Sequence, residues 1–171
     1  MAPTHTATSI RALNPSDAEA YRALRLEALA TAPEAFSSSY EEEQALSLDD
    51  FRGRIRTSGP GVIFGAFAGE DLVGIAAFMV LDRVKQRHKG ALLGLFVQPQ
   101  WRSRGLGKAL VTHVIAHAAK HVRVLRVTVV TANERARQMY HRLGFVPYGI
   151  EPKALCVNGA FYDEELLALE L

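Results

Sequence analysis

A strand, a helix and a second strand follow one another in the middle of the chain, and this order restricts the fold more than any other feature. ALLGLFVQ, residues 91–98, and VRVLRVTVV, residues 122–130, are apolar and read as strands. Between them, apolar residues recur at helical spacing, which predicts a helix from Gly105 to about Lys120. Strands joined by a helix lie parallel in one sheet. The sequence therefore predicts an α/β fold with a parallel strand pair.

Two more strands, VIFGAF at 62–67 and LVGIAAFMVL at 72–81, come just before this unit. Short polar turns connect them to each other and to the strand at 91–98. Such connections are too short for a crossover, so the three strands form an antiparallel meander.

Helical structure is expected in the first third of the chain. Asn14 is a cap residue before a proline and begins a helix that runs to about Ala30. Ser47 begins a second helix in the same way. Residues 33–46, between the two, show no helical period and are expected to be irregular.

The last third of the chain predicts one helix and a hairpin. Asn133 caps a short helix that Gly144 ends. Asn158-Gly159 is a strong hairpin signal between two apolar segments. The final segment has helical propensity, but the hairpin needs a partner strand, so a strand is predicted over residues 161–171.

Composition limits the class of protein. A chain of 171 residues, 49% of them apolar, fits one domain over residues 10–171, preceded by a loose leader over residues 1–9. Its 20 Lys and Arg against 18 Asp and Glu do not indicate a nucleic-acid binder. There is no segment long and apolar enough to suggest a membrane partner, and Cys156 is a lone cysteine, expected to be buried in a strand. These features predict a cytoplasmic protein.

The decapeptide WRSRGLGKAL, residues 101–110, has the features of an anion site. Gly105 and Gly107 stand at the start of the predicted helix, where unpaired N–H groups and the helix dipole attract phosphate. Two common nucleotide-binding motifs are absent. A P-loop requires Ser or Thr where Ala109 stands, and the dinucleotide-binding motif requires Gly where Leu110 stands. The glycines and arginines of this segment alone do not identify the anion that binds there.

Two longer motifs resemble those of the GNAT family of N-acetyltransferases. VQPQWRSRGLGKAL, residues 97–110, is similar to its acetyl-CoA-binding motif, whose core is Q/R-x-x-G-x-G/A. TANERARQMYHRLGF, residues 131–145, is similar to its second motif, N-x-x-A-x-x-x-Y-x-x-x-G-F. The resemblance implies the GNAT fold, a mixed and mostly antiparallel sheet flanked by helices, in which the central parallel pair splays apart to admit acetyl-CoA. Inside the first of these two strands, Gly94 marks either a bulge or close packing.

The resemblance also implies site residues. Tyr140 corresponds to the tyrosine that protonates the departing CoA thiolate. The cofactor-binding positions carried over from the motifs are Leu95, Val97, Arg102, Arg104, Gly105, Leu106, Gly107, Lys108, Ala109 and Asn133.

The implied activity is transfer of the acetyl group of acetyl-CoA to a primary amine of a small molecule, a peptide N-terminus or a lysine, by direct attack in a ternary complex. The alternative is a GNAT-like module that binds acetyl-CoA as a sensor without turnover. Family members often form dimers, so the resemblance implies a homodimer as a partner. The sequence itself does not indicate one.

The general base is left open. The strand at 91–98 has no acid where many relatives carry a glutamate. Glu41, Glu42 and Glu43 follow the first helix, where the family builds its acceptor site, and His88 precedes the strand. Each of these, or a water alone, stays open as the base.

No metal is expected. Three histidines recur at helical spacing, but no acidic residue accompanies them as metal sites require, so they are expected on a solvated helix face. They are His113, His117 and His121.

Overall fold

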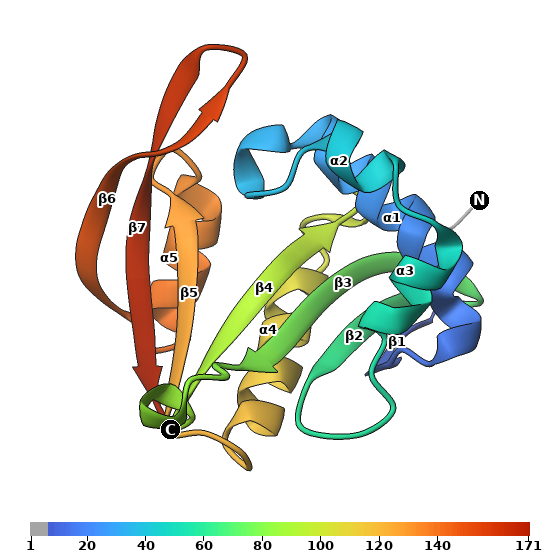
Figure 1. Ribbon diagram of the computed structural model, residues 1–171, viewed down its shortest axis with the longest axis horizontal. Helices are drawn as coiled ribbons and strands as arrows, with labels where there is room; N and C mark the ends of the chain where they lie inside the picture. Colours follow the sequence, from blue (N-terminus) through green and yellow to red (C-terminus); the bar gives the residue numbers. More distant parts are fainter. Residues whose placement is uncertain (1–6) are drawn as a thin grey trace.

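The computed structural model describes residues 7–171 as one seven-stranded mixed sheet with helices on both faces (Figure 1). The strand order in the described part of the chain is β1-β2-β3-β4-β5-β7-β6, and there only the β4–β5 pair is parallel. This agrees with the predicted α/β class, meander and parallel pair. The strands are β1 Thr8–Ala12, β2 Val62–Ala68, β3 Asp71–Val80, β4 Lys89–Val97, β5 Val124–Val130, β6 Val146–Val157 and β7 Ala160–Glu170.

Within residues 7–171, five α-helices accompany the sheet: α1 Ala18–Thr31, α2 Tyr40–Gln44, α3 Leu48–Arg54, α4 Leu106–Ala118 and α5 Glu134–Arg142. Helix α2 and a 3-10 turn at Pro33–Ala35 occupy the segment that was expected to be irregular. Ser39 accepts a hydrogen bond from the Glu42 N–H, and the Glu42 side chain accepts one from the Ser39 N–H, which is a capping box. This local pairing starts a helix too short to show a period.

Each face of the sheet has its own core. Helices α1 and α3 pack on one face, where Leu24 and Phe51 are buried with Phe96 of β4. Helices α4 and α5 pack on the other, where Leu110 is buried with Leu125 of β5. The sheet therefore separates a face covered by α1–α3 from a face covered by α4 and α5.

The parallel strands β4 and β5 are paired only at one end. Their register covers Lys89–Ala91 against Val124–Arg126, and no further pair joins them (Figure 1). Figure 1 shows the two strands diverging from that end towards their carboxyl ends. A gap bounded by two strand edges thus opens in the middle of the sheet.

The tail forms the predicted hairpin, and its last segment is strand β7 rather than a helix. Asn158 and Gly159, with φ values of 50° and 81°, form the turn. Strand β7 lies between β5 and β6, which leaves β6 at the edge of the sheet. Both faces of most of β6 are exposed, so Cys156 is exposed and the expectation of a buried thiol is wrong.

The chain start differs from the expected leader. Strand β1 begins at Thr8, inside the segment 1–9, and pairs with β2. Residues 1–6 lie outside the described residues. Within residues 7–171 no helix has the length and apolar character needed to cross a membrane.

Both histidines of α4 pack against aromatic side chains. His117 is half-buried against Phe64 and Phe78, with Nε2 2.8 Å from the Pro60 carbonyl oxygen, and His113 contacts Phe64. His117 therefore departs from the expected solvated face, because strands β2 and β3 lie beneath it. In the described part of the chain, no three His, Cys, Asp or Glu side chains cluster closely enough to hold a metal ion.

Candidate active site

The loop between β4 and α4 presents free N–H groups at one point. Ser103 and Gly105 have φ values of 63° and 79°, so the chain turns tightly before α4. The first helical hydrogen bond is donated by the Ala109 N–H to the Gly105 carbonyl at 2.9 Å. The N–H groups of the first turn therefore lack helical partners and, with the helix dipole, form a cradle for an anion.

Space remains open above this turn. A Cβ added to Gly107 would come no closer than 3.9 Å to Met139 Sδ and Val97 Cγ2, and one added to Gly105 would meet nothing within 4 Å. Because the described side chains leave this space empty, a pyrophosphate can approach the backbone there. The loop thus fits the pyrophosphate of acetyl-CoA.

The cations of the loop have different roles. The Arg102 Nε donates to the Val97 carbonyl at 2.9 Å, and its guanidinium lies over the Phe96 ring, so this side chain braces the end of β4. Arg104 lies over the ring of Trp101, 4.6 Å from its centroid, and is exposed like Lys108. Arg102 is exposed as well, but its Nε is engaged by Val97, so Arg104 and Lys108 are the loop cations that are freer to turn towards a phosphate.

Strand β4 bulges where the gap opens. Ile75 of β3 is in register with Phe96, and Ala77 with Leu93, so Gly94 and Leu95 have no registered partner on β3. The β5 register ends earlier, at Ala91, and leaves them without a partner on that side as well. Gly94 has a φ of 62°, which glycine adopts without strain. Backbone groups of the bulge are consequently available to a molecule in the gap.

Helix α5 is docked beside the loop and carries Tyr140. Arg135 Nη2 donates to Ser103 Oγ at 3.2 Å. Tyr140 is buried with its ring edge-on to Phe145, and burial raises its pKa. The hydroxyl is therefore neutral at physiological pH and can donate a hydrogen bond. Asn133 caps the helix by accepting from the Ala136 N–H at 3.2 Å.

A buried carboxylate that sequence reasoning missed fixes α5 to the sheet. Glu165 of β7 accepts from Arg137 at 3.0 and 3.1 Å and lies 3.1 Å from His141 Nε2. The hydrogen bond from Arg137 lowers the pKa of Glu165 and outweighs burial, which raises it; with the further hydrogen bond from His141, the pKa lies below its ordinary value. The ionised Glu165 therefore holds the helix that carries Tyr140.

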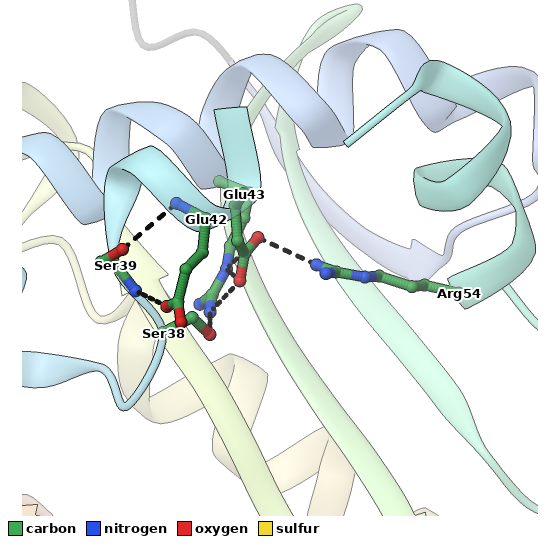
Figure 2. A network of polar contacts seen from close by, with 6 residues as sticks. Ser38, Ser39, Glu42, Glu43 and Arg54 are labelled. Atoms are coloured by element: carbon green, nitrogen blue, oxygen red, sulfur yellow. Dashed lines mark hydrogen bonds and ion pairs between the residues drawn. The ribbon is translucent and has the colours of Figure 1, made fainter. Parts of the chain in front are cut away.

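Glu43 of α2 is held in a network of polar contacts that joins α1, α2 and α3 (Figure 2). Its side chain is 4% exposed and accepts from Arg25 Nη2 and Arg54 Nη1, both at 2.9 Å. Burial raises the pKa of Glu43, but the hydrogen bonds from Arg25, Arg54 and Ser38 outweigh burial and lower it to about 2. A carboxylate this acidic and fully paired is a poor proton acceptor, so Glu43 is a structural residue and not the base.

The other acids and the histidine considered as bases also lie in unsuitable places. Glu42 caps its own helix, and Glu41 is exposed. His88 precedes Lys89, which is paired with Val124 at the closed end of the gap, far along β4 from the bulge.

Glu164 of β7 is a candidate base that sequence reasoning did not find. Its neighbours Glu165 and Leu167 face α5, so the alternation of a strand places Glu164 on the face covered by α1–α3. It is in register with Val130 of β5 and with Glu151 of β6. Burial and the charge of Glu151 raise its pKa. The sequence gives no sign of this difference, because Glu164 and Glu165 are adjacent acids and the segment DEELLALEL does not alternate between polar and apolar residues.

Residues 33–35 close this side of the site. The 3-10 turn they form contacts both β5 and β6, which are the neighbours of β7. The segment after α1 therefore reaches across the open end of the sheet, and the acceptor side of the gap lies between it, the β4 bulge and β7.

Comparison with known proteins agrees with this geometry. The Acetyltransferase (GNAT) family matches residues 21–145. The chain is 34% identical over 142 residues to a mycothiol acetyltransferase of Streptomyces scabiei, covering 82% of this chain and 43% of that protein. It is 31% identical over 100 residues to an L-amino acid N-acetyltransferase of Escherichia coli, covering 57% and 61%.

Among solved structures, the fold superposes on the protein yncA of Salmonella typhimurium, determined with its cofactor acetyl-CoA. The TM-score is 0.84 at 18% identity, over 96% of this chain and 94% of that one. The chain spans 43% and 61% of the lengths of the two curated relatives. From the family match over most of its length, the chain belongs to the GNAT family of acetyltransferases.

Proposed function

We propose that the protein is an N-acetyltransferase that transfers the acetyl group of acetyl-CoA to a primary amine. The observation that carries this proposal is the gap between β4 and β5, which opens at a bulge with free backbone groups and ends at the glycine cradle of α4. A cradle for a pyrophosphate joined to a strand edge suits a nucleotide with a long amide-containing arm. Acetyl-CoA, when bound, supplies the activated acetyl group.

The residues assigned to the cofactor follow from this arrangement. The free N–H groups of the first turn of α4, from Leu106 to Lys108, bind the pyrophosphate, and Arg104 and Lys108 add positive charge. The Ala109 N–H does not take part, because it already donates to the Gly105 carbonyl. Leu95 offers backbone groups to the arm. Val97 contributes less than expected, because its carbonyl already accepts from Arg102.

Proton transfer is divided between two sides of the gap. A primary amine with a pKa near 10.4 is mostly protonated at neutral pH and must lose a proton before it can attack. We assign this step to Glu164, because a carboxylate with a raised pKa is a better base than an ordinary one. Tyr140, kept neutral by burial, donates a proton to the departing thiolate. A bulge N–H faces the developing negative charge on the acetyl oxygen.

The name of the Escherichia coli relative, an L-amino acid N-acetyltransferase, supports an amine as the acceptor. The test is to mix the purified protein with acetyl-CoA and a panel of amino acids, diamines and peptides and to follow free thiol. Thiol release that depends on one class of amine is expected. Tight binding of CoA by calorimetry without thiol release from any amine would instead identify a sensor module.

A further inference from the structure

The guanidinium of Arg25 lies over the β4 bulge. Arg25 comes from α1, and its Nη1 is 3.6 Å from the position of a Cβ on Gly94. Its side chain is 11% exposed and stacks on the Phe36 ring at 4.6 Å. Stacking and burial hold the planar group in one orientation. A fixed cation thus lies against the strand segment where acetyl transfer is proposed.

One nitrogen of Arg25 is free at this point. Nε and Nη2 donate to the carboxylate of Glu43 at 3.2 and 2.9 Å, and Nη2 also reaches Ser38 Oγ at 3.3 Å. Nη1 forms no hydrogen bond with any residue the structure describes. Nη1 is also accessible to solvent. Within residues 7–171, the only side-chain nitrogen or oxygen that is both buried and without a hydrogen-bond partner is Arg22 Nε. Two N–H donors of Arg25 are therefore available beside the bulge.

The three charged groups that are joined by ion pairs here, Arg25, Arg54 and Glu43, carry one net positive charge. Arg25 and Arg54 share a single carboxylate, and both oxygens of Glu43 are engaged by them (Figure 2). An acceptor that carries only ammonium groups is repelled by this charge at short range. An acceptor that also carries a carboxylate gains a charge-assisted hydrogen bond there.

We propose that the acceptor is an amino acid or a similar amine with a carboxylate next to the amino group, and that Arg25 Nη1 binds this carboxylate. The inference rests on the proposed N-acetyltransferase function. In an α-amino acid the carboxylate and the amine are attached to one carbon, so a carboxylate held by Arg25 keeps the amine beside the bulge. Polyamines, lysine side chains and peptide N-termini lack a carboxylate in this position. Arg25 is thus a specificity-determining residue.

The first test compares acceptors that differ only in the carboxylate. From a panel of the common L-amino acids, the best acceptor is paired with the amine left after decarboxylation and with the amino acid amide. We expect kcat/KM for the amino acid to exceed that of both analogues by about tenfold to a hundredfold, the range of a hydrogen bond to a charged group. Equal values, or a preference for the decarboxylated amine, would overturn the inference.

The second test separates Arg25 from the rest of the network. In the double variant Arg25→Gln, Glu43→Gln, neither a free guanidinium nor an unpaired buried carboxylate remains at the bulge, and the preference for the amino acid should disappear. Arg54→Gln is the matched control, because it removes the other cation of Glu43 while leaving Nη1 over Gly94. Arg54→Gln should keep the preference. Retention of the preference by a folded double variant would contradict the role of Arg25.

A binding measurement keeps this inference distinct from the proposed activity. Wild-type protein saturated with CoA is titrated by calorimetry with the amino acid and with its decarboxylated analogue. Tighter binding of the amino acid is expected whether or not turnover occurs. Carboxylate-dependent binding without thiol release would therefore contradict the N-acetyltransferase proposal but not the carboxylate site. If neither compound binds, or both bind alike, the carboxylate site does not exist.

Discussion

Replacing Glu43 with glutamine isolates the contribution of one buried charge to stability. The substitution keeps the size of the side chain but leaves Arg25, which is 11% exposed, without an anion. Burying an unpaired cation is unfavourable, since the protein does not replace the lost hydration. We therefore expect Glu43→Gln to lower the free energy of unfolding.

The size of the effect follows from the pKa of Glu43, which folding lowers from 4.5 to about 2. At about 1.4 kcal/mol per pH unit, this difference corresponds to roughly 3 kcal/mol. Arg54 is 36% exposed, so solvent screens its share, and about 2 to 3 kcal/mol is expected at pH 7. Because the pKa is lower in the folded state, this stabilisation is fully present above about pH 4.5. It is lost as the pH falls towards about 2.

Urea unfolding of the wild type and Glu43→Gln at pH 7 and pH 3 tests both the size and the sign. The difference between the two proteins should be largest at pH 7 and should shrink by more than half at pH 3. Glu41→Gln, an exposed change in the same helix, is the control and should shift stability by less than about 1 kcal/mol. A Glu43→Gln variant as stable as the wild type at pH 7, or a difference independent of pH, would refute the reasoning.

The remaining predictions concern the site. Gly107→Glu places a side chain and a negative charge in the open cradle, so calorimetry should show CoA affinity reduced by at least about tenfold. The control is Gly53→Glu, at an open glycine of α3, which should leave CoA affinity unchanged. Tyr140→Phe should lower kcat by about tenfold to a hundredfold with acetyl-CoA affinity retained, and full activity would remove Tyr140 from proton transfer. In the wild type, kcat/KM should rise with pH as Glu164 loses its proton, and the midpoint of this rise should lie above the ordinary carboxyl pKa. Glu164→Gln should abolish the rise. Glu151→Gln should move it to lower pH, because it removes the negative charge that raises the pKa of Glu164.

Local patterns predicted most of the fold. The strand–helix–strand order predicted the parallel pair, and Asn158-Gly159 predicted the hairpin, because each depends on residues close in sequence. Helix α2 was missed although Ser39 and Glu42 provide a capping box, since a helix from Tyr40 to Gln44 shows no period. The exposure of Cys156 depends on which strand lies at the edge, which a single sequence does not indicate.

The site was only partly predictable, because sequence patterns locate only those features that are built from residues close in the chain. The glycine loop is one continuous segment, and its motif located it. The paired groups that support the site come from distant segments: Glu43 is 18 residues from Arg25, and Glu165 is 28 residues from Arg137. No spacing rule connects such pairs, because folding brings their strands and helices together.

The position of β7 between β5 and β6 has a consequence for the order of folding during synthesis. Strand β6 leaves the ribosome before β7, yet it pairs with no other strand in the described sheet. Helix α5 likewise emerges before Glu165, the residue that secures it to the sheet. A nascent chain can thus form the β1–β4 meander early, while the tyrosine helix is secured only after β7 has emerged. Premature termination before β7 would therefore leave the edge of β5 open to pairing with other chains.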